Sequence, residues 1–312
     1  MPPILKATNL SKRFSTLQAV EDLSFEVQEG DVYGFLGQNG AGKSTTIRML
    51  LSLIKPDDGT IEVFGKSLRQ HRQQILQQIG AVIEKPDLYK YLSAIDNLKL
   101  FARMSGIHPT TNMLMSQLEQ VGLQGREKDI VKTFSQGMKQ RLGIAIALIH
   151  NPRLVILDEP VNGLDPQGIA DIRNLILRLS KEDGKTIFLS SHLLNEIEQV
   201  ASRILIIDRG KKVVEGAAAE LFDPAKTVVE LLTEDNNTCA QLIQSSMEWS
   251  KKMKPARNHF ILMEMHRNEV PAFNRWLAVH PVNVLSLQPR HSLEDYFLQV
   301  TTAHQHVPAY TN

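Results

Sequence analysis

Short apolar runs alternate along the chain with longer segments in which apolar residues recur at helical spacing. Four runs are typical of buried strands: 31–36, 79–84, 154–157 and 186–192. The first is followed by residues 44–54, whose apolar positions predict a helix that continues until Pro56. A second helix is expected to begin at about Gly137, ahead of the third run. This order of elements predicts an α/β domain in the first two thirds of the chain.

The last third has a different pattern, which begins after a turn signal at Asp223-Pro224. Its predicted strands are 227–232, 259–265 and 282–288, and its predicted helices are 238–249, 269–280 and 292–302. This alternation predicts a small βαβαβα domain with its helices on one side of a sheet. We therefore expect a large domain over 1–218, a small α+β accessory domain over 219–302 and a disordered tail over 303–312.

A glycine-rich loop, "GQNGAGKST", lies between the first predicted strand and the first predicted helix. Gly37, Gly40 and Gly42 let the backbone turn its N–H groups inward, and the helix N-terminus adds a favourable dipole. Lys43 supplies a cation, and the Ser44 hydroxyl can reach a Mg²⁺ ion that bridges the outer phosphates. Such a loop cradles a polyphosphate. The residues that we assign to it are Gly37, Gln38, Asn39, Gly40, Ala41, Gly42, Lys43, Ser44 and Thr45.

Two adjacent acids, Asp158 and Glu159, follow the third apolar run in "RLVILDEP". Neighbouring residues at a strand end point in different directions, so the two carboxylates can take different roles. We expect Asp158 to hold Mg²⁺ through water and Glu159 to polarise the attacking water as a general base. Acids at a strand end can also be merely solvated, and the loop upstream is what favours the catalytic interpretation.

Two further segments offer groups to an anion. The small polar turn in "TFSQGM" opens the second helix, whose free N–H groups form another anion site. One triphosphate does not readily need two helix N-termini from the same subunit, whereas two subunits packed head to tail could each offer one to the other's nucleotide. His192 lies at the carboxyl end of the fourth predicted strand, where α/β sheets bind ligands.

The composition limits the class of partner. Among 312 residues, 35 Lys and Arg face 34 Asp and Glu, and the formal charge of +1 gives no bulk electrostatic reason to expect nucleic acid or an anionic membrane surface as a partner. The single cysteine, Cys239, excludes an internal disulfide. The first residues lack the features of a signal peptide, and the apolar runs are too short to cross a bilayer. We therefore expect a cytoplasmic chain.

Taken in order, the motifs resemble the nucleotide-binding domain of ATP-binding cassette (ABC) proteins over about residues 4–218. "GQNGAGKST" is similar to Walker A, "FSQGM" to the signature, "LVILDEP" to Walker B, "NGLD" to the D-loop and "SSH" to the H-loop. The resemblance implies a P-loop NTPase fold with a mixed sheet core, an antiparallel β subdomain and a helical subdomain over about 85–150. It also implies a dimer driven by Mg-ATP, with two nucleotides held between Walker A of one subunit and the signature of the other.

The resemblance implies roles for several residues. Phe14 would stack on adenine, and Asp165 would link the two sites across the dimer. Ser135 and Gly137, in the signature that also contains Gln136, would bond the partner's γ-phosphate. His192 would hold the same phosphate from within its own subunit. The usual signature is Leu-Ser-Gly-Gly-Gln, from which this chain departs at Phe134, Gln136 and Met138.

Glu84 occupies the place where most of the family has a glutamine that reaches Mg²⁺ and the attacking water. Near a phosphate, an unpaired carboxylate is repelled by roughly 3 kcal/mol per unit charge at about 5 Å and an effective dielectric constant near 20. We therefore expect Glu84 to ligate Mg²⁺ when ATP is bound. A glutamate here resembles the ATPase subunits of exporters that protect bacteria from lantibiotics and bacitracin-type peptides.

The favoured hypothesis is an ATPase that powers export of a peptide antibiotic or another amphipathic compound through a separate membrane permease. The chain would be a homodimer, or pair with a paralogous ATPase, on the cytoplasmic face of the membrane, with the insert between Glu84 and Phe134 acting on the permease. The alternative is a soluble ABC-type mechanochemical or regulatory ATPase. Such proteins usually carry two cassettes or long coiled-coil insertions, and this sequence has one cassette and no heptad run. A phosphotransferase would leave the signature and D-loop unexplained.

Overall fold

The computed structural model describes residues 2–222, 227–257 and 259–291. The chain forms two compact units, Met1–Ala217 and Ala218–Asn312, and each is described by itself. The segments 223–226 and 292–312 lie outside the described residues, and so do the expected helix 292–302 and the expected tail 303–312.

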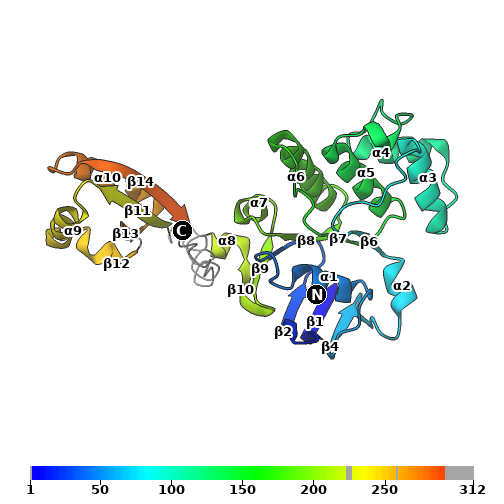
Figure 1. Ribbon diagram of the computed structural model, residues 1–312, viewed down its shortest axis with the longest axis horizontal. Coiled ribbons are helices and arrows are strands. Elements are labelled where there is room, and N and C mark those ends of the chain that lie inside the picture. Colours follow the sequence, from blue (N-terminus) through cyan, green and yellow to red (C-terminus); the bar gives the residue numbers. More distant parts are fainter. Residues whose placement is uncertain (1, 223–226, 258, 292–312) are drawn as a thin grey trace, which may run out of the picture. The chain divides into compact units, whose positions relative to one another are not determined.

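A six-stranded sheet forms the centre of the N-terminal unit, in the order β10-β9-β3-β8-β7-β6 (Figure 1). Its strands are β3 (Val32–Leu36), β6 (Ile79–Val82), β7 (Leu154–Leu157), β8 (Thr186–Ser191), β9 (Arg203–Asp208) and β10 (Lys211–Ala217). All pair in parallel except β10, which runs antiparallel to β9. Every residue of β3, β7 and β8 is buried, which is why these strands are almost continuously apolar in the sequence.

A second, antiparallel sheet packs against the first and contains β1, the first strand of the chain (Figure 1). Its strands are β1 (Leu5–Phe14), β2 (Leu17–Val27), β4 (Asp58–Val63) and β5 (Lys66–Ser67). Aromatic rings join the two sheets, because Phe25 of β2 lies 5.9–6.0 Å from the rings of Tyr33, Phe35 and Phe188 in the central sheet. This core fixes the position of β3 and β8, whose ends carry the site described below.

The described residues of the N-terminal unit include seven helices beside the sheets. They are α1 (Lys43–Leu50), α2 (Arg72–Leu76), α3 (Ala94–Met104), α4 (Thr111–Gln120), α5 (Gln136–Leu148), α6 (Pro166–Lys181) and α7 (Leu194–Glu198), with a 3₁₀ turn at Val131–Thr133. Helices α3, α4 and α5 gather at one end of the unit (Figure 1). The expectation that the first helix continues to Pro56 is wrong: it ends at Leu50 because Ser52 adopts a left-handed backbone with φ of 54°.

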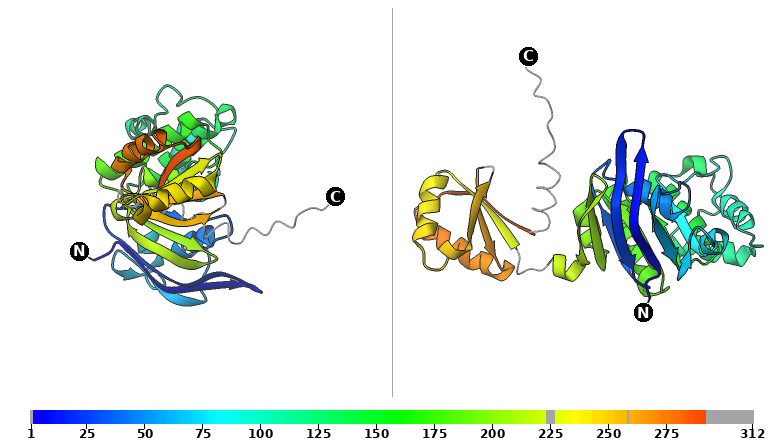
Figure 2. Two further views of the ribbon diagram at one scale, coloured as in Figure 1. Left: turned by 90° about the vertical axis from the view of Figure 1, so that its left-hand side faces the viewer. Right: turned by 90° about the horizontal axis from the view of Figure 1, so that it is seen from below.

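The C-terminal unit begins with α8 (Ala218–Leu221) and continues with a four-stranded antiparallel sheet in the order β12-β13-β11-β14. Its elements are β11 (Thr227–Thr233), α9 (Asn236–Ser245), β12 (Met253–Arg257), β13 (Phe260–Met265), α10 (Val270–Ala278) and β14 (Val284–His291), with 3₁₀ turns at Ser250–Lys252 and Arg267–Glu269. Both α9 and α10 cover one face of the sheet (Figure 2).

The βαβαβα prediction for this unit is wrong, since the described elements run βαββαβ, a split βαβ arrangement. The missed strand is β12, which contains Pro255. Proline cannot donate to a sheet ladder, so its presence argued against a strand. Because β12 is an edge strand, the proline is tolerated.

Candidate active site

The carboxyl ends of four neighbouring parallel strands meet at one edge of the central sheet. In the sheet, β3, β8, β7 and β6 are consecutive neighbours. The glycine-rich loop follows β3, His192 follows β8, Asp158 and Glu159 follow β7, and Glu84 lies two residues beyond β6. Segments far apart in the sequence therefore converge where α/β sheets bind ligands.

The loop after β3 is shaped by two glycines in the left-handed region, Gly40 with φ of 83° and Gly42 with φ of 106°. A Cβ atom at Gly42 would lie 2.5 Å from the carbonyl oxygen of Ala19, so no other residue fits there. Gly42 precedes α1, and no described side chain caps that helix. The N–H groups of its first turn have no acceptor within the helix and can bind an anion.

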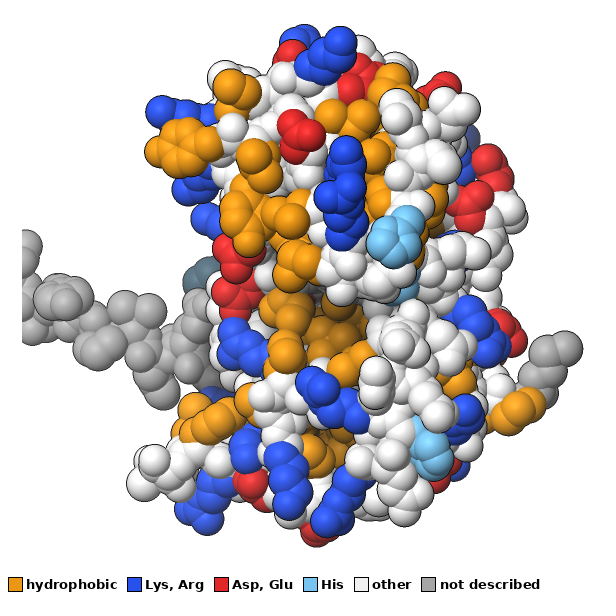
Figure 3. Space-filling view, turned by 90° about the vertical axis from the view of Figure 1, so that its right-hand side faces the viewer, with side chains coloured by type: hydrophobic (Ala, Val, Ile, Leu, Met, Phe, Trp, Pro, Cys, Tyr) orange, Lys and Arg blue, Asp and Glu red, His pale blue; other side chains and the backbone are white. Residues whose placement is uncertain are grey.

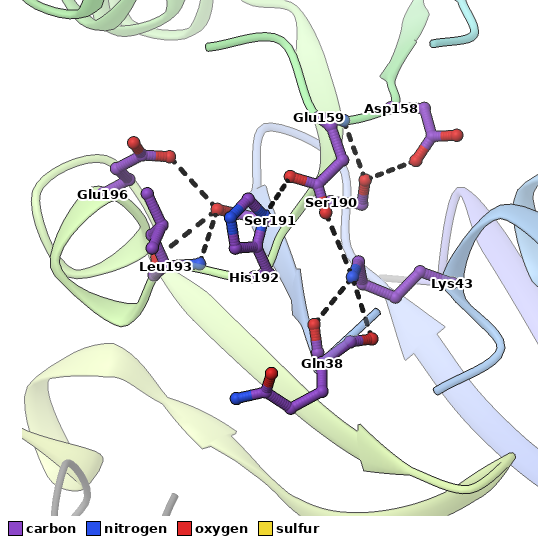
Figure 4. Close-up of polar contacts among 10 residues, drawn as sticks. Gln38, Lys43, Asp158, Glu159, Ser190, Ser191, His192, Leu193 and Glu196 are labelled. Carbon is purple, nitrogen blue, oxygen red and sulfur yellow. Dashed lines mark hydrogen bonds and ion pairs between the residues drawn. The ribbon is translucent and has the colours of Figure 1, made fainter. Parts of the chain in front are cut away.

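Lys43 is the cation of this loop, and only 6% of its surface is exposed. Its Nζ donates hydrogen bonds to the carbonyl oxygens of Gly37, at 2.6 Å, and Gln38, at 3.2 Å. The same ammonium group forms an ion pair of 3.0 Å with Oε1 of Glu159 (Figure 4). The loop carbonyls and Glu159 thus fix Lys43 at the edge of the sheet. Ser44 and Thr45 follow in the first turn of α1 and are half-buried.

Glu159 lies between Lys43 and His192 (Figure 4). Its Oε2 is 2.7 Å from Nδ1 of His192, and its backbone N–H donates to Oγ of Ser190 at 2.9 Å. An ionised carboxylate only accepts hydrogen bonds, so this contact requires the proton on Nδ1 of the imidazole. The backbone of Glu159 adopts a φ of 49°, a conformation that is costly outside glycine and that turns the carboxylate toward its two partners.

Asp158 is 1% exposed, and its Oδ1 accepts a hydrogen bond of 2.6 Å from Oγ of Ser190. Its other oxygen, Oδ2, is buried and has no hydrogen-bond partner among the described residues. A buried carboxylate oxygen without a partner is costly, so it marks a place for a cation or a water molecule. The hydroxyl of Ser190 therefore holds both neighbours, Asp158 through its side chain and Glu159 through its backbone.

Glu84 lies at the same edge of the sheet, but its side chain pairs with a residue outside the cluster around Lys43 and Glu159. Its side chain is 61% exposed, and Oε1 pairs with Nη2 of Arg48 at 2.5 Å. Its backbone, like that of Glu159, is in the left-handed region, with φ of 56°. The sequence pointed to Glu84 alone, because nothing in the pattern of α1 indicates that Arg48 faces it.

Two residues of the site carried no role in the sequence reasoning. Ser190 was part of the "SSH" motif, and the structure makes it the joint between Asp158 and Glu159. Glu196 lies four residues after His192 on α7 and accepts a hydrogen bond of 3.1 Å from Oγ of Ser191. Burial raises the pKa of Glu196, and the hydrogen bond from Ser191 partly opposes that shift. No pattern in the sequence indicated this contact.

The signature and D-loop residues lie outside this cluster. Ser135 caps α5 by accepting a hydrogen bond of 3.2 Å from the N–H of Met138, and Gly137 lies in the first turn of that helix. Nε2 of Gln136 donates to the carbonyl oxygen of Asn162 at 3.2 Å. Asp165 caps α6 through the N–H of Gly168 at 3.0 Å. In the part of the chain that the structure describes, no hydrogen bond or ion pair connects these residues with the loop 37–45.

Phe14 ends β1 and is 44% exposed, an unusual degree for a phenylalanine. The Nζ atom of Lys12 lies 5.5 Å from the centre of its ring. A ring that is open on one face and has a cation nearby is suited to stacking against a flat, electron-rich group.

Comparisons with known proteins agree with this geometry. A family model described as "ABC transporter" matches residues 20–162, and one described as "AAA domain, putative AbiEii toxin, Type IV TA system" matches residues 130–198. The chain is 42% identical over 301 residues to the bacitracin transport ATP-binding protein BcrA of Bacillus licheniformis, covering 96% of this chain and 98% of that protein. It is 44% identical over 228 residues to the lantibiotic transport ATP-binding protein SrtF of Streptococcus pyogenes, covering 73% and 95%.

A solved structure of an ATP-binding subunit of an ABC transporter has a TM-score of 0.62 and 31% identity to this chain, covering 70% of this chain and 91% of that one. The resemblance and the fold class expected from the motifs are thereby confirmed. With a phosphate-binding loop, a carboxylate pair and a histidine at one edge of the sheet, and with relatives that match it nearly from end to end, the chain belongs to the family of ABC transporter ATP-binding proteins and is an ATPase.

Proposed function

We propose that this chain hydrolyses Mg-ATP to power the export of a peptide antibiotic or a similar amphipathic compound through a separate membrane permease. The observation that carries the proposal is the likeness to BcrA, which extends over 96% of this chain and therefore includes the C-terminal unit. Within the described residues, no helix combines the length and the apolar character needed to cross a bilayer.

The residues present fit a Mg²⁺ ion. Mg²⁺ prefers hard oxygen ligands, which Asp158, Glu84 and Ser44 offer, and Oδ2 of Asp158 is buried without a described partner. We assign Ser44, Asp158 and Glu84 to the metal. When bound, Mg²⁺ would neutralise charge on the outer phosphate oxygens of ATP.

Lys43 exchanges partners when ATP binds. The ammonium group now lies between the loop carbonyls and Glu159, and a phosphate oxygen in the loop replaces Glu159 as its counterion. The exchange releases Oε1 of Glu159, while Oε2 still accepts from His192. Glu159 then orients the attacking water and accepts its proton as a general base, which typically accelerates a reaction by about 10²–10⁴-fold.

His192 holds the γ-phosphate from within the subunit. Nδ1 donates to Glu159, so Nε2 is the ring atom left to face the phosphate. The ring thus connects the general base with the group that is transferred.

The N-terminus of α5 acts on the nucleotide of a second subunit. In each subunit, Ser135, Gln136 and Gly137 present the helix N-terminus to the other subunit's γ-phosphate, so the active form is a dimer of this chain or a pair with a paralogous ATPase. Asp165, at the start of α6, connects the two sites across the dimer. Phe14 stacks on adenine.

The loop after Glu84 transmits the state of the site to the helical segment. A Cβ atom at Gly143 of α5 would lie 2.4 Å from Cγ of Pro86, so the loop packs directly on the signature helix. The buried side chain of Asn97, on α3, accepts from the N–H of Tyr89 at 2.8 Å and donates to its carbonyl oxygen at 3.0 Å. The loop that follows Glu84 is therefore in direct contact with α3 and α5.

A cluster of exposed apolar side chains provides the permease surface. Figure 3 shows the face of the N-terminal unit that carries α2 and α3, on which hydrophobic side chains gather in a band bordered by Lys and Arg. The tyrosine-loop cluster consists of Tyr89, Tyr91, Leu92 and Ile130, exposed by 52%, 80%, 37% and 49%. Its two chain segments are hydrogen-bonded to each other, because the N–H of Val131, which follows Ile130, donates to the carbonyl oxygen of Leu92. The cluster docks a cytoplasmic segment of the permease, which keeps the chain on the cytoplasmic face of the membrane.

The C-terminal unit, which we assign as an accessory domain, serves dimer contact or regulation. Its core is built from Val229, Leu231, Met263, Phe273 and Leu277. Among its described residues, no group of three or more His, Cys, Asp or Glu side chains could hold a metal ion.

The proposal is tested with a tagged Glu159→Gln variant, in which the general base is lost and ATP stays bound. The variant is expressed in its native host, the membranes are solubilised gently with Mg-ATP, and co-purifying proteins are identified by mass spectrometry. We expect one multi-span membrane protein. A matched Tyr91→Ala change in the same background should lose that protein but still bind ATP. Recovery from the cytosol alone, with ribosomes, nucleic-acid enzymes or nothing attached, would overturn the transport proposal in favour of a soluble ATPase.

A further inference from the structure

We propose that Arg48 is a positioning residue that holds Glu84 away from the metal in the nucleotide-free chain and releases it when Mg-ATP binds. The inference rests on the proposed role of Glu84 as a metal ligand. The observation behind it is the contact of 2.5 Å between Nη2 of Arg48 and Oε1 of Glu84, which gives the carboxylate a definite partner outside the phosphate loop.

The spacing along α1 places Arg48 and Ser44 one above the other on the helix. Ser44, the proposed metal ligand, and Arg48 are four residues apart on the same helix, so they lie on the same face. Their backbone positions differ by about 6 Å along the helix axis, at about 1.5 Å per residue. The carboxylate of Glu84 therefore needs to travel only about one helical turn to exchange Arg48 for a metal held beside Ser44.

Rotation of the Glu84 side chain is enough for this exchange of partners. The loop is fixed on one side by β6 and on the other by Pro86, which packs against Gly143. The φ of 56° at Glu84 is costly for a residue with a Cβ atom, and such strain persists where the surroundings impose it. The side chain is 61% exposed, so rotation about its own bonds meets little obstruction.

The negative charges at this edge of the sheet explain why pairing Glu84 with Arg48 is useful. Asp158 and Glu159 already bring two carboxylates to this edge, and Lys43 is occupied by Glu159 and by loop carbonyls. Without Arg48, Glu84 would be a third carboxylate near the place where the phosphates arrive, and it would repel them until the metal neutralised it. With Arg48, the carboxylate is neutralised before ATP binds and becomes a ligand only when a stronger cation replaces the arginine.

The consequence is competition between Arg48 and the metal for one carboxylate. Removing the arginine should strengthen metal binding, because the ion pair no longer has to be broken. Exposed ion pairs contribute little, so the expected change is about two- to fivefold. Removing Arg48 also removes a positive charge near the metal, an effect that does not depend on Glu84.

A double-mutant cycle separates these two effects. The variants are Arg48→Gln, Glu84→Gln and the pair, each in the Glu159→Gln background so that ATP is not consumed. The probe is Mn²⁺ as a spectroscopic stand-in, titrated with saturating ATP and followed by electron paramagnetic resonance. We expect Arg48→Gln to bind Mn²⁺ about two- to fivefold more tightly when Glu84 is present and to change the affinity less in the Glu84→Gln variant. Arg48→Lys, which keeps the charge, should restore much of the original affinity.

Arg153→Gln is the matched control, because Arg153 forms an exposed ion pair of 2.8 Å with Glu29 on another part of the N-terminal unit. It should leave the Mn²⁺ affinity unchanged. If Arg48→Gln has the same effect with and without the Glu84→Gln change, or no effect, Arg48 does not hold Glu84 and the inference is overturned. The metal role of Glu84 then still stands as long as Glu84→Gln weakens Mn²⁺ binding. If Glu84→Gln leaves the Mn²⁺ affinity unchanged, the proposed role of Glu84 fails, and the inference fails with it.

Discussion

The N-terminal unit buries charge where the C-terminal unit buries only apolar and hydroxyl-bearing side chains among its described residues. At the site edge, Lys43 and Asp158 are 6% and 1% exposed. The core of the C-terminal unit is instead formed around Trp249, Phe273 and Leu231. Burying a charge is costly unless a partner compensates it, so a protein retains such residues where they do chemistry. The difference places the chemistry of the ATPase in the N-terminal unit.

Most of the longer helices in both units have a side chain that caps the N-terminus, and α1 does not. Asp235 caps α9 by accepting hydrogen bonds from the N–H groups of Asn237 and Thr238, and His266 and Glu269 form a capping box before α10. In contrast, no described side chain caps α1. An uncapped helix end is unfavourable by itself, and it becomes useful when an anion takes the place of the cap.

The largest expected effect is a loss of stability of the C-terminal unit that leaves the ATP site of the N-terminal unit intact. Phe273→Ala removes a buried ring that packs 5.0 Å from Trp249, and we expect it to destabilise the C-terminal unit by about 3–5 kcal/mol. Both tryptophans of the chain, Trp249 and Trp276, lie in this unit, so tryptophan fluorescence in a urea titration reports on it alone. ATP binding, measured by calorimetry, should be unchanged.

The half-buried Trp276 provides a milder companion variant. Trp276→Phe keeps an aromatic ring in the same core and should lower the stability of the unit much less than Phe273→Ala. Loss of ATP binding in Phe273→Ala at a urea concentration that unfolds only the C-terminal unit would show that the site depends on that unit, and the division drawn above would be wrong.

The next largest effect concerns the buried cation. Lys43→Ala removes the counterion of the phosphates, and we expect ATP to bind about 30- to 150-fold more weakly, or about 2–3 kcal/mol. Calorimetry with ATP, ADP and adenosine measures it, and the adenosine affinity should be unaffected. Lys66→Ala is the control, because the exposed Lys66, on β5 of the antiparallel sheet, donates to Gln74 of α2. Equal losses for ATP and adenosine would indicate damage to the fold in place of a lost phosphate contact.

The sequence predicted the parts of the site that depend on local pattern. Lys43 and Asp158 follow apolar strands, and parallel strands bring their carboxyl ends to one edge whatever the rest of the fold. The contact between Arg48 and Glu84 could not be predicted, because it depends on how α1 lies beside the loop after β6. Strand β12 was missed for a similar reason, since Pro255 is compatible with a strand only at the edge of a sheet.

A smaller effect is expected at the adenine. Phe14→Ala removes an exposed ring and should weaken both ATP and ADP by about 1–2 kcal/mol, or about five- to thirtyfold, within the range typical of base stacking on an aromatic side chain. Pyrophosphate binding should not change, whereas Lys43→Ala should weaken it. Phe14→Tyr should retain most of the affinity. Leu17→Ala alters the residue paired with Phe14 in the hairpin and is the control. If Leu17→Ala reproduces the loss, the hairpin shape matters and the ring does not stack on adenine.

The smallest effect is a pH dependence confined to the N-terminal unit. Nε2 of His150 lies 3.0 Å from the carbonyl oxygen of Ile79, the first residue of β6, and Nδ1 is buried without a described partner. Burial lowers the pKa of His150 below its ordinary value of 6.5, and the hydrogen bond to Ile79 partly opposes that shift. The folded chain therefore binds fewer protons at His150 than the unfolded chain does.

The sign of the effect follows from linkage. The stability contributed by neutral His150 is fully present above about pH 6.5 and is lost as the pH falls through the lower pKa of the folded state. His150→Gln cannot be protonated but can still donate to Ile79, so the pH dependence of unfolding between about pH 7.5 and 5 should be weaker in this variant. The exposed His108→Gln is the control. Circular dichroism follows the whole chain and tryptophan fluorescence the C-terminal unit, so the change should appear in the first and not in the second. A change of equal size in both would mean that the two units unfold together, and the contrast between them would then hold for their chemistry but not for their stability.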